Sequence, residues 1–160
     1  MDRCHIREAR ADDKPAILKF IFALQQHEGV IEPNRRLDQF VSEEHYTVLI
    51  PYVAAHNGKI LVAEDKAGRV VGWAAVYEDG GDVFIRAEER AHGFLAELYV
   101  VEAERGAGVG RALITACEEW ARGRGLVSLR IGLLARNASA ARVYDKAGYA
   151  PYALTVRKYL

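Results

Sequence analysis

The chain has 160 residues, of which 51% are hydrophobic and 28% charged, a composition typical of one folded domain (residues 1–160) and not of a disordered or fibrous protein. Lysine and arginine number 22, as do aspartate and glutamate, so no net charge attracts nucleic acid or an anionic membrane. Two cysteines are too few for a disulfide framework, and no apolar run is long enough to span a membrane. We therefore expect a cytoplasmic protein without a metal site.

The first half of the chain predicts a short strand, two helices and an antiparallel pair of strands. Asp12 or Asp13 caps the first helix, Pro15 lies in its first turn, and residues 29–33 interrupt it. The second helix is weaker, and the paired strands are joined by the turn 65–68. In chain order these elements are expected over residues 5–7, 12–28, 37–46, 59–64 and 70–77.

The second half predicts alternating strands and helices. Residues 78–82 form a loop, and residues 83–92 give no clear pattern. A strong strand, a helix, a second strand, a short helix and a final strand or strand pair follow. These are expected over residues 94–101, 108–122, 126–134, 137–146 and, for the last, 149–152 and 154–159. The predicted order is β-α-α-β-β-β-α-β-α-β, an α/β class.

A glycine-rich turn stands between the strong strand and the helix that follows it. In ERGAGVGRA (104–112), glycine recurs at alternate positions, and bare backbone at a helix N-terminus suits an anion because the N–H groups point outward. The Walker pattern fails because Arg111 stands where its second glycine is required. The dinucleotide pattern fails because Arg111 or Leu113 stands at its third glycine. The pattern R/Q-x-x-G-x-G/A fits from Arg105 to Gly110. These six residues alone are equally compatible with a purely structural helix entry.

Two separated blocks resemble the GNAT superfamily of N-acetyltransferases. Residues 97–114 (ELYVVEAERGAGVGRALI) are similar to its acetyl-coenzyme A segment, and residues 137–149 are similar to its block N-x-x-A-x-x-x-Y-x-x-x-G-F/Y. The blocks stand in the family's order, and only Glu102 and Ala107 depart from its usual residues. The resemblance covers roughly residues 60–152. It implies a GNAT-like, mixed and splayed central sheet flanked by helices.

The resemblance also implies where acetyl-CoA binds. Main-chain amides from Gly106 to Arg111 would hold the pyrophosphate, with positive charge from Arg105 and Arg111. The pantetheine arm would pair with the backbone of residues 98–100 where the sheet splays. Asn137 would fix the cofactor or cap its own helix. The implied cofactor-binding residues are Leu98, Tyr99, Val100, Arg105, Gly106, Ala107, Gly108, Val109, Gly110, Arg111 and Asn137.

Members of this family transfer the acetyl group directly to an amine, without an acyl-enzyme. Tyr144 resembles the family's general acid, because a phenol with a pKa of about 10 stays protonated at neutral pH; a buried structural tyrosine is the alternative. Glu97 stands where several members carry an acid that works through water, and strand alternation puts it on the face of Tyr99. A structural Glu97, or a reaction without a dedicated base, remains open. A main-chain N–H within 99–101 would stabilise the oxyanion.

The acceptor is expected to be the primary amine of a small molecule. The neutral overall charge offers no strong docking surface for a protein, and the acidic loops at 78–82 and 88–89 suit a cation. Peptide or protein amines remain the alternative, and a non-catalytic acyl-CoA sensor is less favoured because Tyr144 is present. The polar cluster 25–28 is either near the acceptor or a solvated helix end. Family members often pair through a terminal strand, so residues 154–160 suggest a possible homodimer.

Overall fold

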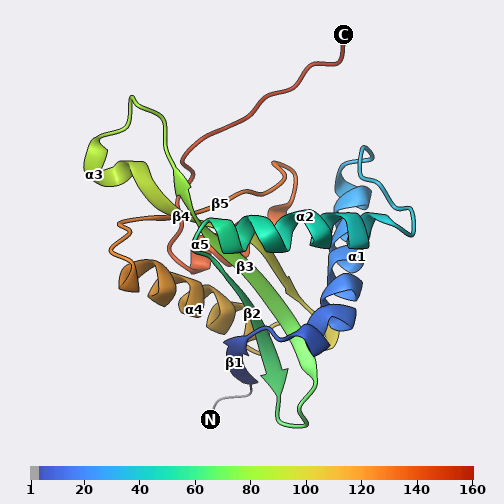
Figure 1. Cartoon of the computed structure of the whole chain (residues 1–160). Helices are drawn as coiled ribbons and strands as arrows, with labels where there is room; N and C mark the ends of the chain where they lie inside the picture. The colour runs from blue at the N-terminus through green and yellow to red at the C-terminus, as the bar shows by residue number, and fades with distance from the viewer. Residues whose placement is uncertain (1–3) are drawn as a thin grey trace.

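The computed structural model describes residues 4–160 as one sheet with helices on both faces (Figure 1). The elements in chain order are β1 (Cys4–Glu8), the 3-10 turn η1 (Ala11–Asp13), α1 (Lys14–Ile31), α2 (Val41–Ala55), β2 (Lys59–Asp65), β3 (Val70–Gly80), α3 (Ala87–Arg90), β4 (Ala91–Val100), the 3-10 turn η2 (Glu102–Glu104), α4 (Val109–Gly123), β5 (Leu129–Ile131) and α5 (Ala138–Lys146). The α/β class with a mixed sheet is confirmed.

The sheet has five strands in the order β1-β2-β3-β4-β5, antiparallel except for the parallel pair β4–β5. The register of β3 and β4 shifts between Ala75 and Val76, so that Ala96 is the extra residue of a bulge on β4. β5 pairs only with Gly93, Phe94 and Leu95. From Ala96 onward β4 therefore has a partner on one side alone, and the predicted splay lies here.

Each face of the sheet packs against its own helices. On one face, α4 contributes Val109, Leu113, Ile114 and Cys117, which are all at most 2% exposed, to a core with residues of β2, β3 and β4. On the other face, α1 and α2 pack on Trp73 and Ala75, which are fully buried. Apolar residues spaced three or four apart give α4 this single buried face.

Two predicted helices have different bounds in the structure. α1 continues through Gly29 to Ile31, and a Cβ at Gly29 would lie in ordinary contact, 3.5 Å, with the side chain of Leu37. The second helix is Val41–Ala55 and not 37–46, even though Pro51 lies inside it. Leu49 and Val53, four residues apart, are buried against the sheet, and this packing outweighs the local cost of the proline.

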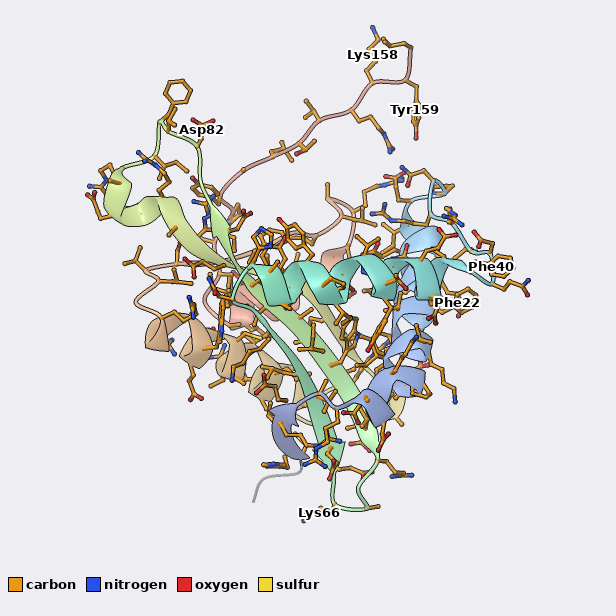
Figure 2. All side chains as sticks on the ribbon, in the orientation of Figure 1. Phe22, Phe40, Lys66, Asp82, Lys158 and Tyr159 are labelled. Atoms are coloured by element: carbon orange, nitrogen blue, oxygen red, sulfur yellow. The ribbon has the colours of Figure 1, made fainter. Side chains whose placement is uncertain are left out.

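The predictions for the later strands need four corrections. β3 extends to Gly80, and the unassigned residues 83–92 contain the short helix α3 and the start of β4. β5 covers only Leu129–Ile131 and not 126–134, because β4 turns away from it after Leu95. The final strands at 149–152 and 154–159 do not form: residues 151–160 make no sheet pairing and extend from the body, where Figure 2 labels Lys158 and Tyr159.

None of the helices within residues 4–160 combines the length and the apolar character that a bilayer crossing requires.

Candidate active site

A cleft of about 780 Å³ opens where the sheet splays. One wall is the end of β4, and the others are the N-terminus of α4, one side of α5, and Leu24 and His27 of α1. Ten of the thirteen candidate site residues from the sequence line it. They are Leu98, Tyr99, Val100, Arg105, Gly106, Gly108, Gly110, Arg111, Asn137 and Tyr144.

The glycine turn enters α4 with two residues in the left-handed region. Gly106 has φ 75° and Gly108, the N-cap of α4, has φ 92°, values that side-chain-bearing residues rarely adopt. A Cβ at either position would meet nothing within 4 Å. The first bond into the helix runs from the Ala112 N–H to the Gly108 carbonyl, so the amides of residues 109–111 precede the helical ladder. Such amides are available to an anion in the cleft.

The free edge of β4 forms a second wall of the cleft, next to the glycine turn. The Val101 N–H donates to the Val71 carbonyl at 2.9 Å, so its amide is committed to β3. By the alternation of an antiparallel ladder, Tyr99 also points its amide toward β3, while Leu98 and Val100 point theirs toward the cleft. The Val100 carbonyl accepts from Arg105 Nε at 3.1 Å. Of the stretch 99–101, only the Val100 N–H therefore faces the cleft.

Tyr144 reaches the cleft from α5. Burial, followed by the negative charges of Glu97 and Glu28, raises the pKa of its phenol to about 12. The proton therefore stays on the phenol throughout the neutral range. The centre of its ring lies 6.1 Å from the centre of the ring of Tyr149, a residue just beyond the end of α5.

Glu97 lies on the α1–α2 face of β4, and its side chain is 11% exposed. Its Oε1 lies 2.7 Å from Nε2 of His45, a residue of α2 that is 52 positions away in the sequence. The hydrogen bond to Glu97 raises the pKa of the His45 imidazole. The negative charge of Glu97 contributes to the raised pKa of Tyr144, so the two candidate catalytic residues lie within electrostatic range of each other.

Other candidate residues have structural contacts of their own. Asn137 is 7% exposed and caps α5, because its Oδ1 accepts from the Ala140 N–H at 3.1 Å. Arg111 Nη1 donates to the Ala147 carbonyl at 3.1 Å, which links the start of α4 to the end of α5. Cys117 is fully buried, and burial raises the pKa of its thiol to about 12. A reactive thiolate at Cys117 is thereby excluded.

The acidic loops that the sequence suggested for the acceptor lie elsewhere. Glu78 pairs with Arg124, and both Glu88 and Glu89 pair with Arg86. None of these residues lines the cleft, and Asp82 lies at the tip of the β3–β4 hairpin (Figure 2). From the cluster 25–28, by contrast, His27 lines the cleft and Glu28 acts on Tyr144.

The part of the chain that contains all the cleft-lining residues matches a known family. The model of the Acetyltransferase (GNAT) family matches residues 22–149. The chain belongs to the GNAT acetyltransferase family. A relative of this chain, the aminoglycoside N(6')-acetyltransferase type 1 of Klebsiella aerogenes, is 31% identical in an alignment 115 residues long that covers 67% of this chain and 71% of the relative. This GNAT protein is an acetyl-CoA-dependent acetyltransferase.

Solved structures share the fold of this GNAT protein along nearly its whole length. A mutant of the BH1408 protein from Bacillus halodurans superposes with a TM-score of 0.82 at 15% identity, covering 98% of this chain and 99% of the other. The aminoglycoside acetyltransferase meta-AAC0020 from an uncultured soil metagenomic sample, in complex with trehalose, gives 0.64 at 21% identity, covering 99% and 95%. At such identities these likenesses concern the fold alone.

Two long-range contacts, made by residues that do not themselves line the cleft, were not predicted from the sequence of this GNAT protein. His45 stands four residues before Leu49 and eight before Val53, so an apolar stripe of period four on α2 would have placed it on the buried face. Arg136 donates from Nη2 to the Ile31 carbonyl at 2.7 Å and so links the loop before α5 to the end of α1. No local sequence pattern predicts the contact between Arg136 and Ile31, since the two residues are 105 positions apart.

Proposed function

We propose that this protein transfers the acetyl group of acetyl-CoA to the primary amine of a small cationic molecule, by direct attack in a ternary complex. The observation that carries the proposal is one cleft that combines the glycine entry of α4, the free edge of β4 and the phenol of Tyr144. The glycine turn suits the pyrophosphate of the cofactor, because Gly106 and Gly108 carry no side chain and a Cβ at either position would meet nothing within 4 Å.

The residues that would hold the cofactor divide into two groups. The main-chain amides of residues 106–111, including Ala107 and Val109, would bind the pyrophosphate at the N-terminus of α4, with charge from Arg105 and Arg111. The cleft-facing backbone of Leu98 and Val100 would bind the amides of the pantetheine arm. Acetyl-CoA, when bound, supplies a thioester whose acetyl group an amine can take.

Tyr144 acts as the general acid in this proposal. Its phenol keeps its proton at neutral pH and holds it at Oη for the departing sulfur. The Val100 N–H points into the cleft and stabilises negative charge on the carbonyl oxygen. Cys117 takes no part, because its thiol lies in the core and stays protonated.

Glu97 accepts the proton of the acceptor amine. The carboxylate is mostly buried, belongs to the residue that directly precedes the cleft-lining Leu98, and acts electrostatically on Tyr144. Glu28 adds a second negative charge on the same side, although Arg35 is paired with it at 2.9 Å. These two carboxylates near Tyr144, the proposed general acid, favour a cationic amine as acceptor. The aminoglycoside relative supports a small-molecule acceptor.

A free-thiol release assay with a panel of amines tests this function. The panel holds aminoglycosides, polyamines, amino acids and peptides with free N-termini or lysines, and mass spectrometry checks each product for one added acetyl group. We expect turnover with a small polyamine or aminoglycoside and little with peptides. Transfer to peptides alone would replace the acceptor in this proposal, and no transfer to any amine, with tight coenzyme A binding, would favour a sensor.

A further inference from the structure

His45 is the one side chain within residues 4–160 that hydrogen-bonds Glu97. Its Nε2 lies 2.7 Å from Oε1, and this contact leaves the second carboxylate oxygen without a hydrogen bond from another described side chain. The imidazole is 38% exposed while the carboxylate is 11% exposed. The pair therefore connects a largely buried carboxylate beside the cleft to a ring that reaches solvent.

Few other charged groups face this pair. Tyr144 of α5 senses Glu97, and Glu28 of α1, which also acts on Tyr144, is paired with Arg35. On α2 itself the carboxylates of residues 43 and 44 are paired with the side chains of residues 14 and 36, at exposed positions. Glu97 is accordingly the group to which the charge of His45 responds.

We propose that His45 is a positioning residue that acts through Glu97: it fixes the carboxylate beside the cleft, and its protonation state sets how readily Glu97 accepts the proton of the acceptor amine. This inference rests on the proposed function, in which Glu97 receives that proton. His45 itself touches neither substrate.

The physical reason is charge compensation at short range. An imidazolium at 2.7 Å neutralises the carboxylate and makes it a weaker proton acceptor and a weaker attractor of an ammonium group. A neutral imidazole can still donate from Nε2, so it keeps the orientation and leaves the full negative charge. The hydrogen bond to Glu97 raises the pKa of His45 above its ordinary value, and transfer should increase as pH rises and His45 loses its proton.

His45→Gln separates titration from orientation, because an amide donor can take the place of Nε2–H but cannot gain a charge. The measured quantity is the ratio of kcat/KM for the amine between variant and wild type, in which the titration of the amine itself cancels. If only the form with a neutral imidazole transfers the acetyl group, this ratio should be at least about fourfold higher at pH 6 than at pH 9, because even an imidazole with the ordinary pKa of about 6.5 is about three-quarters protonated at pH 6. His45→Ala, which removes the donor as well, should be slower than His45→Gln at both pH values.

His56→Gln is the matched control, since His56 lies just beyond the same helix and bonds the Tyr52 carbonyl, not Glu97. Its ratio to wild type should be flat with pH. A flat ratio for His45→Gln would overturn the inference, and so would equal rates of the glutamine and alanine variants.

An NMR titration of the His45 ring tests the coupling without any turnover. In wild type it should titrate at higher pH than in Glu97→Gln, and an unchanged titration would also overturn the inference. If wild type acetylates no amine, the proposed function fails and this inference fails with it. A failure of the inference alone is recognised by an active wild type.

Discussion

Alanine at Gly108 and alanine at Gly110 should change stability in opposite directions. Gly108 has φ 92°, and a Cβ there would meet nothing within 4 Å, so the cost of alanine is conformational and not steric: about 1–2 kcal/mol. Gly110 is the second residue of α4, and its Cβ would make an ordinary contact of 3.7 Å with Val100. Alanine there should gain up to about 1 kcal/mol of helix propensity.

Thermal and urea denaturation measure both effects. For a domain of this size a change of 1 kcal/mol moves Tm by about 2–4 °C, so Gly108→Ala should lower Tm by about 2–8 °C and Gly110→Ala should raise it by up to about 4 °C. A Gly108→Ala variant as stable as wild type would refute the requirement for a left-handed residue.

Binding of coenzyme A is measured separately, by calorimetry on a Gly108→Val variant. The valine side chain would project into the cleft and should abolish coenzyme A binding in a folded protein. Unchanged affinity would refute the placement of the pyrophosphate.

The remaining predictions concern the two proposed catalytic residues, Tyr144 and Glu97, and the C-terminal tail (residues 151–160). Tyr144→Phe should lower turnover by about 10²–10⁴-fold with little change in coenzyme A affinity, and a full-rate variant would reduce Tyr144 to a packing residue. Glu97→Gln should lose more activity at about pH 7.5 than at about pH 10, where more of the amine is neutral; an equal loss at both values would argue against a base. We also propose that the apolar side chains exposed on the tail form the homodimer contact, so deletion of residues 152–160 should yield a monomer by light scattering, and a monomeric full-length chain would contradict this.

The elements that line the cleft were predictable because their signals are local. The alternating glycines at 106–110 indicate a backbone that reaches positive φ, and the strand before them is strongly apolar. Asn137 caps α5, as its position in the sequence suggested. Local rules of this kind need no knowledge of distant partners, and the turn, α4 and α5 lie close to where they were expected.

The elements that were missed depend on tertiary contacts. α2 carries Pro51 and a weak amphipathic pattern, so only the burial of Leu49 and Val53 against the sheet determines where it lies. The alternating residues of the tail resemble a strand, but within residues 4–160 no neighbouring strand pairs with it. The contact of His45 with Glu97 joins residues 52 positions apart, which no local pattern can indicate.

The splay beyond Leu95 places a strand edge inside the sheet instead of at its border. Unpaired backbone groups at an edge are a template for pairing with other chains, and proteins usually cover them. If the cofactor is what covers this edge, its occupancy becomes part of the folding equilibrium: at a concentration one hundred times Kd it adds about 2.7 kcal/mol to the stability of the folded state. The abundance of the intact protein in a cell should then follow the supply of coenzyme A as well as its own synthesis.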